Sequence, residues 1–176
     1  LGHPGDSLGS RDGDFPLTPP KHWRLGERLD GKRFAGTSLH APATEENATA
    51  LRELRRLGFR SAFVDDDFRL ARGPGEIGGC FCAEHRAAFL REHGYPAARW
   101  DEVLNDIRER RFTKLLRAWV DGNCDQLTAS FRAQKRAFDG SFGNMVMYLG
   151  AEKAGIRLRD YRRAPARVGE LMFAGA

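Results

Sequence analysis

Segments with the hydrophobic pattern of a strand alternate along this chain with segments that have the pattern of a helix. Strand patterns are expected at residues 33–40, 60–64, 144–150 and 167–173. Helix patterns are expected at residues 44–57, 83–93 and 100–138, and the last of these allows a break near 121–124. Consecutive strands joined by helices pair in parallel, because each crossover returns the chain to the same end of the sheet. The chain is therefore predicted to be an α/β protein with parallel strands and outer helices.

The first 32 residues differ from the rest of the chain. They are rich in glycine and proline, and Asp30–Gly31 is a turn signal between two short stretches. We assign residues 1–32 to a loop-rich N-terminal approach with a hairpin turn, and residues 33–176 to a single domain. The chain starts at Leu1 without a methionine and ends directly after a strand pattern. Both ends are therefore expected to be cuts in a longer protein, and a secretion signal could have been lost upstream of Leu1.

Composition excludes several classes of protein. A chain of 176 residues with 41% hydrophobic and 30% charged residues is ordinary for a globular domain, and no apolar run reaches the length of a membrane span. Most arginines stand at helical spacing among acids, without interleaved aromatic residues, so nucleic acid is not an expected partner despite the net charge of +5. Cys80 and Cys82 are too close in sequence for an unstrained disulfide, which favours a reducing compartment and a cytoplasmic location.

Three consecutive aspartates, Asp65, Asp66 and Asp67, follow the second strand pattern. In parallel sheets, binding and catalytic groups lie where the strands end. Adjacent carboxylates repel one another, so a fold that keeps them must supply a partner such as Arg69, a bound cation or a raised pKa. Two interpretations follow, a functional edge of the sheet or a solvated strand end without chemistry.

A Cys-x-Cys-x-x-His sequence, made of Cys80, Cys82 and His85, directly precedes a helix pattern. Two thiolates and an imidazole suit zinc, and a structural zinc ion takes a fourth protein ligand. Candidates for this ligand are residues elsewhere in the chain: His40 and, as alternatives, Cys124 and His93. If no metal binds, the two cysteines are small apolar residues of a loop and His85 is a surface residue of the helix.

The string VDDDFRL…GGCFCAEHRAAFLREHGY, which begins at Val64, resembles the DNEYG…CYCDxCxxxFxxWLxxKYG segment of glycoside hydrolase family 42, the β-galactosidases of clan A. The likeness extends in consistent order over about residues 23–150. The family fold is a (β/α)8 barrel with the acid/base residue after the fourth strand and the nucleophile after the seventh. The resemblance therefore implies a partial (β/α)8 TIM barrel, about strands 3 to 6, with outer helices.

The resemblance also implies roles for the acidic residues. Asp67 takes the place of the acid/base glutamate, and Asp66 that of an asparagine that contacts the sugar 2-hydroxyl. Both depart from the family pattern, since the acid is shorter by one methylene and an amide donor is replaced by an acceptor. The remaining residues expected to bind substrate or to orient the acid are Asp65, Arg69, His40 and Glu152.

The family's zinc ligands are matched in part. Cys80 and Cys82 coincide with two of its cysteines, His85 replaces the third, and Ala41 stands at the fourth. His40, one position earlier, is the residue that can substitute for the missing ligand. The resemblance thus implies a structural zinc ion.

The function implied by the resemblance is cleavage of O-glycosidic bonds of a carbohydrate substrate by the full-length protein, with Asp67 as general acid/base. Because the nucleophile would lie outside these residues, the segment alone is expected to be inactive. Two alternatives stay open. One is a zinc-binding structural module, and the other is an enzyme that holds Mg²⁺ or Mn²⁺ through Asp65 and Asp67. Assembly into a homo-oligomer is also open.

Overall fold

The computed structural model describes residues 22–34, 39–64, 70, 77–146, 155, 157 and 171–173. These residues contain four α-helices: α2 (Ala43–Arg56), α3 (Ala83–Glu92), α4 (Arg99–Arg108) and α5 (Lys114–Phe138). They also contain five strands: β1 (Gly26–Glu27), β2 (Arg33–Phe34), β3 (Ser61–Val64), β4 (Ser141–Val146) and β5 (Leu171–Phe173). None of the helices in this part of the chain is both long and apolar enough to cross a membrane.

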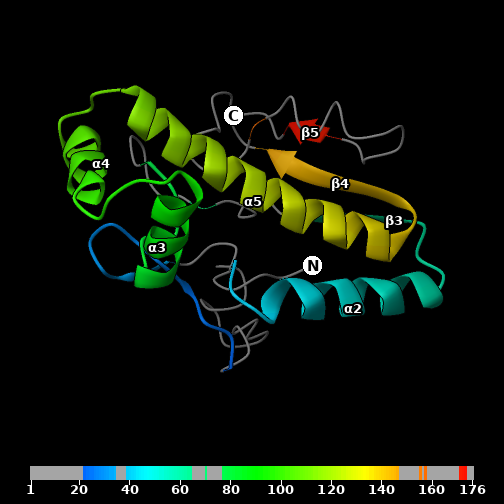
Figure 1. Cartoon of the computed structure of the whole chain (residues 1–176). Coiled ribbons are helices and arrows are strands. Elements are labelled where there is room, and N and C mark those ends of the chain that lie inside the picture. Colours follow the sequence, from blue (N-terminus) through cyan, green and yellow to red (C-terminus); the bar gives the residue numbers. More distant parts are fainter. Residues whose placement is uncertain are drawn as a thin grey trace.

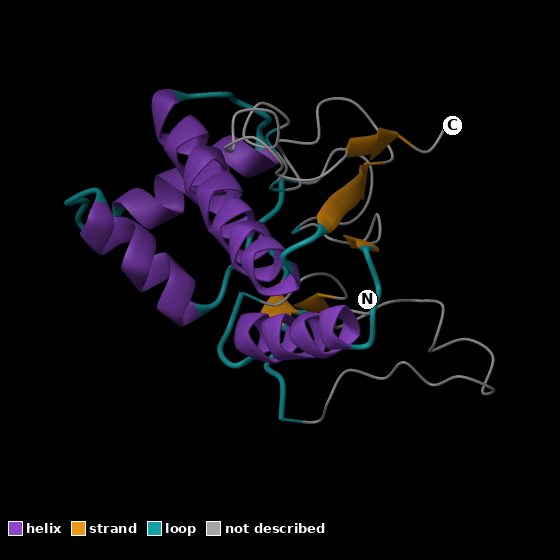
Figure 2. Ribbon diagram, turned by 90° about the vertical axis from the view of Figure 1, so that its right-hand side faces the viewer, coloured by secondary structure: helices purple, strands orange, loops and turns teal. Residues whose placement is uncertain are grey.

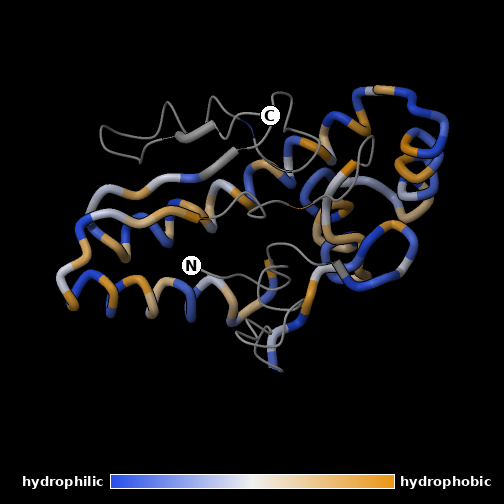
Figure 3. Tube along the Cα trace, turned by 180° about the vertical axis from the view of Figure 1, so that it is seen from behind, coloured by the Kyte–Doolittle hydropathy of each residue, from blue (hydrophilic) through white to orange (hydrophobic). Residues whose placement is uncertain are grey.

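A three-stranded parallel sheet, in the order β3-β4-β5, forms one layer of the fold. Val64, the last residue of β3, pairs with Asn144, and Asn144 pairs with Leu171, the first residue of β5. The three strands therefore run in the same direction, but β5 begins at the level where β3 ends. Helices α2 and α5 form a second layer on one face of this sheet (Figures 1 and 2). The hydrophobic and hydrophilic residues of both helices recur turn by turn, as expected for helices that bury one face (Figure 3).

Two hydrophobic clusters share helix α5. The first fills the space between the sheet and the helices, and includes Leu51 of α2, Phe131 of α5 and Phe142 of β4. The second joins α3, α4 and the first half of α5 around Trp100 and Trp119, whose rings meet edge to face at 5.1 Å. Because α5 contributes to both clusters, it fixes α3 and α4 relative to the sheet.

The predicted partial barrel is wrong. The described residues form an open three-stranded sheet and a separate two-stranded antiparallel pair, β1-β2, in place of consecutive barrel strands. Residues 33–34, the start of the first predicted parallel strand, pair locally with Gly26–Glu27 through the turn at Asp30 and Gly31. Gly31 has φ +77°, and Asp30 Oδ1 accepts a bond from the Lys32 N–H at 3.1 Å. A tight turn closes such a hairpin at lower entropic cost than a distant parallel pairing.

The long predicted helix at 100–138 is divided, but at a different place from the expected one. It breaks at 109–113, where Arg110 has φ +55° and the Thr113 side chain caps α5 by accepting the Leu116 N–H at 3.1 Å. The run 121–124 stays helical, although Gly122 lowers the helix propensity there. The burial of Trp119, on the preceding turn, outweighs that cost.

The buried carboxylate of Asp106 holds the α4–α5 turn together. It is 5% exposed and accepts hydrogen bonds from Thr113 Oγ1 at 2.5 Å and Arg111 Nε at 3.1 Å. We expect Asp106→Ala to lower the free energy of unfolding by about 1–3 kcal/mol, because the partners lose a buried acceptor. Urea denaturation measures this change. Asp101→Ala, at an exposed position of the same helix, is the control and should cost less than about 1 kcal/mol.

Candidate metal centre

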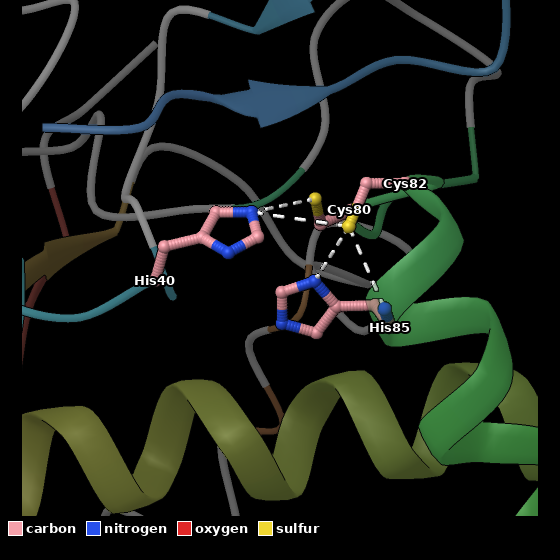
Figure 4. A group of neighbouring side chains, drawn as sticks. All are labelled: His40, Cys80, Cys82 and His85. Carbon is pink, nitrogen blue, oxygen red and sulfur yellow. Dashed lines mark hydrogen bonds between the residues drawn. The ribbon is translucent and has the colours of Figure 1, made fainter.

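Four side chains from two distant parts of the sequence meet in one buried group. His40 lies just before α2, Cys80 and Cys82 lie in the loop before α3, and His85 lies in the first turn of α3. Their donor atoms all lie within 4.8 Å of one another, so the group could hold a metal ion. Figure 4 shows the two imidazole rings next to each other, with His40 Nε2 and His85 Nδ1 turned toward the two sulfur atoms, and the ring centroids lie 4.7 Å apart.

The loop that carries the cysteines is held by backbone contacts on both sides. The Gly79 N–H donates to the Leu70 carbonyl at 3.2 Å, which connects the residue before Cys80 to an earlier residue of the segment between β3 and α3. The Phe81 N–H donates to the Glu27 carbonyl at 2.8 Å, and the Glu27 N–H points to Cys80 Sγ at 3.4 Å. The β1–β2 hairpin, residues 26–34, is therefore docked against the cysteine loop.

Cys82 has a second local role, as the N-cap of α3. Its backbone is extended, with φ −64° and ψ 160°, and its sulfur accepts the His85 N–H at 3.5 Å. An extended residue whose side chain bonds to an amide three positions later is the usual way to begin a helix. The cap fixes the first turn of α3, so that His85 returns to the same sulfur, with Nδ1 at 3.2 Å.

The separations between the donor atoms suit tetrahedral coordination. Zinc binds sulfur at about 2.3 Å and nitrogen at about 2.0–2.1 Å, so a sulfur–nitrogen edge of the tetrahedron measures about 3.6 Å. His40 Nε2 lies 3.4 Å from Cys80 Sγ and 3.9 Å from Cys82 Sγ, and the Cys82–His85 separation is 3.2 Å. All three values lie within about 0.4 Å of that edge, so these three sulfur–nitrogen pairs already have the spacing of a tetrahedral zinc site.

Burial sets the protonation of the group. It lowers the pKa of His40 to about 4, helped by the nearby His85 and Arg24 and opposed by Glu84. It also lowers the pKa of His85, so both imidazoles are neutral at neutral pH, which metal ligation requires. Burial raises the pKa of Cys80 to about 11, against the bonds that its sulfur receives from the Cys82 and Glu27 amides. A bound cation would reverse this last preference and favour the thiolate.

The structure thus brings together the three predicted metal ligands and His40. Neither of the other candidates for the fourth ligand joins them. Cys124 is fully buried in α5, and His93 ends α3 with its ring stacked on Tyr95 at 5.3 Å. Five further predicted site residues lie outside the described residues: Asp65, Asp66, Asp67, Arg69 and Glu152.

No family model, curated protein or solved structure matches this chain. The resemblance to glycoside hydrolase family 42 therefore stays a prediction, and the chemistry of the metal group has to be argued from its own geometry.

Sequence reasoning missed three residues around the group. Gly79 has φ +143°, and the loop passes so close to α5 that a Cβ there would lie 2.6 Å from Trp119 Cζ2. Glu84 places its Oε2 atom 3.7 Å from His40 Nδ1. Glu27 provides the amide that points to Cys80 Sγ. Two of them could have been found in the sequence, because Gly79 directly precedes the ligand Cys80 and Glu84 lies between the ligands Cys82 and His85. No local sequence feature indicates a role for Glu27.

Proposed function

We propose that this chain is a zinc-binding domain in which His40, Cys80, Cys82 and His85 hold one structural zinc ion. The observation that carries the proposal is the meeting of two sulfur and two imidazole nitrogen atoms within 4.8 Å of one another. Thiolate and imidazole ligands in a tetrahedral arrangement are typical of zinc. Hard cations such as Mg²⁺ and Ca²⁺ select oxygen ligands instead.

A structural role is favoured over a catalytic one by the number and burial of the ligands. Catalytic zinc keeps one coordination position for water or substrate, whereas four protein ligands fill the tetrahedron. The exposed fractions of His40, Cys80 and Cys82 are 7%, 3% and 2%, which leaves little room for a substrate. Such an ion would link His40, at the start of α2, to the cysteine loop and the first turn of α3. It would also support the β1–β2 hairpin, which is docked on that loop.

Carbohydrate hydrolysis at Asp67 stays a prediction, as does a Mg²⁺ or Mn²⁺ site at Asp65 and Asp67. The supporting fact is a position in the sequence: the acids directly follow Val64, the last residue of β3, at the edge where parallel strands end. A zinc ion in the metal group would fix Cys80 and Cys82, which follow these acids in the sequence. The two functions are therefore compatible, and of the two sites the metal group is the one whose residues the structure describes and whose geometry supports it.

Metal analysis of purified protein tests the proposal. We expect one zinc ion per chain in the wild type and less than about a tenth of that in Cys82→Ser, because loss of one thiolate opens the tetrahedron. Serine is a favourable N-cap residue, so this variant removes the ligand while α3 keeps its start. Circular dichroism of the variant in excess zinc checks that the helices remain.

Cys124→Ala is the matched control, since Cys124 is equally buried but lies in α5, outside the metal group. It should keep one zinc ion per chain. A wild-type protein without zinc after growth in zinc-supplemented medium would contradict the proposal, as would a Cys82→Ser variant that still binds one equivalent.

A further inference from the structure

The carboxylate of Glu84 stands behind the imidazole of His40, on the side away from the sulfur atoms. His40 Nε2 faces Cys80 Sγ at 3.4 Å, while Nδ1, across the same ring, lies 3.7 Å from Glu84 Oε2. The two nitrogens of a neutral imidazole differ, because one carries the proton and the other carries the lone pair. If Nε2 binds a metal, the proton must sit on Nδ1, the nitrogen that faces the carboxylate.

The carboxylate of Glu84 is also held in place by an arginine of the N-terminal segment. Its Oε2 atom accepts a hydrogen bond from Arg24 Nη1 at 2.9 Å, although both side chains are more than half exposed. Arg24 lies just before β1, and Glu84 lies in the first turn of α3, between the ligands Cys82 and His85. One carboxylate therefore contacts the N-terminal segment and a metal-ligand histidine from the helix that carries two further ligands.

We infer that Glu84 is a positioning residue of the metal centre, which holds the proton of His40 on Nδ1 and keeps Nε2 directed at the ion, with Arg24 as its anchor. This inference rests on the proposed zinc site and adds a residue to it. Metal-binding histidines commonly donate their second N–H to a carboxylate, and loss of that partner weakens metal binding by about 10- to 100-fold. The charges are also balanced, since Arg24 neutralises Glu84 and two thiolates neutralise Zn²⁺.

The test compares zinc affinity in a graded series. Competition between the protein and a chromophoric chelator for Zn²⁺ gives the affinity of wild type, Glu84→Gln and Glu84→Ala. We expect Glu84→Ala to bind zinc about 10- to 100-fold more weakly than wild type. Glu84→Gln should fall between them, because its amide oxygen can still accept the proton on Nδ1 but carries no charge. Glu92→Ala is the control, since it removes an exposed acid from the last turn of the same helix.

Two further measurements distinguish the positioning of His40 by Glu84 from an effect of Glu84 on the stability of α3. The thermal midpoint of the zinc-free protein should change little between wild type and Glu84→Ala, because the proposed role operates only with metal bound. In the zinc-bound protein, imidazole ¹⁵N–¹H spectra should show the proton on Nδ1 of His40, and this proton should exchange faster with solvent in Glu84→Ala.

Three results would overturn the inference: equal zinc affinity in wild type and Glu84→Ala, an equal loss in Glu92→Ala, or a destabilisation of the zinc-free form that accounts for the loss. Each of them leaves the zinc site itself standing, as long as the wild type binds one equivalent. A wild type that binds no zinc in the same competition assay would overturn the proposed function, and this inference with it.

Discussion

Removal of zinc by a strong chelator is expected to lower the thermal midpoint of this protein by about 8–16 °C. A ligand present at a thousand times its Kd stabilises the folded state by about 4 kcal/mol, and for a chain of this size each kcal/mol corresponds to about 2–4 °C. The β1–β2 hairpin, residues 26–34, contacts the cysteine loop through Glu27, so an ion bound to Cys80 would stabilise this contact. Differential scanning calorimetry with and without chelator measures the shift.

Removal of zinc should loosen the region around the metal group before the whole domain unfolds. Amide hydrogen exchange of Glu27 and Phe81, whose N–H groups form the contact between the hairpin and the cysteine loop, should speed up on chelation. Amides of the β3–β4 pair, such as that of Phe142, should stay protected, because Phe142 is fully buried in the other cluster. Re-addition of zinc should restore both the midpoint and the protection. A chelated protein with an unchanged midpoint and unchanged exchange would contradict a structural role for the ion.

Among the glycines in the described part of the chain, Gly79 is expected to be the one at which substitution by alanine is most destabilising. A Cβ at position 79 would lie 2.6 Å from Trp119 Cζ2 and 2.8 Å from Asn123 Nδ2, and both side chains are buried in α5. The backbone there, with φ +143°, is also one that alanine rarely adopts. Overpacking and backbone strain each cost about 1–3 kcal/mol, so we expect a total loss of about 2–6 kcal/mol. Because Cys80 is the next residue, zinc affinity should fall as well.

Two other glycines separate the causes of this effect. Gly94 has φ +63° but no atom near its would-be Cβ, so Gly94→Ala measures backbone strain alone. Gly122 lies inside α5 with open space around it, so Gly122→Ala should stabilise the helix by about 0.5–1 kcal/mol. Urea denaturation of the three variants gives the comparison. If Gly79→Ala lowers the free energy of unfolding no more than Gly94→Ala does, the close approach of the loop to α5 does not contribute to the loss of stability.

Local sequence patterns were sufficient for the elements that are themselves local. The helix predicted at 44–57 is α2, Ala43–Arg56, and the helix predicted at 83–93 is α3, Ala83–Glu92. The end of the strand predicted at 60–64 is likewise confirmed, as β3. The prediction of a barrel was wrong, because strand patterns give the length of a strand but not the strand with which it pairs. Residues 33–34 show this, since the tight turn at residues 29–31 decided their pairing.

The metal group shows the same limit at the level of single residues. Cys80, Cys82 and His85 could be predicted from their spacing, because ligands within one loop and one helix turn are close in any fold. His40 is 40 residues earlier than Cys80, and three residues were candidates for its role on the sequence alone. Its selection depends on the packing of α2 against α5 and the docking of the cysteine loop on α5, which no local pattern encodes.

X-ray absorption at the zinc K edge of the zinc-bound protein tests the four-ligand centre most directly. We expect a four-coordinate ion with two sulfur neighbours at about 2.3 Å and two nitrogen neighbours at about 2.0–2.1 Å, the latter with the outer-shell scattering of imidazole rings. A Cys124→Ala sample should give the same spectrum. A first shell with other than two sulfur atoms, or one in which oxygen replaces the imidazole nitrogens, would contradict the coordination of zinc by His40, Cys80, Cys82 and His85.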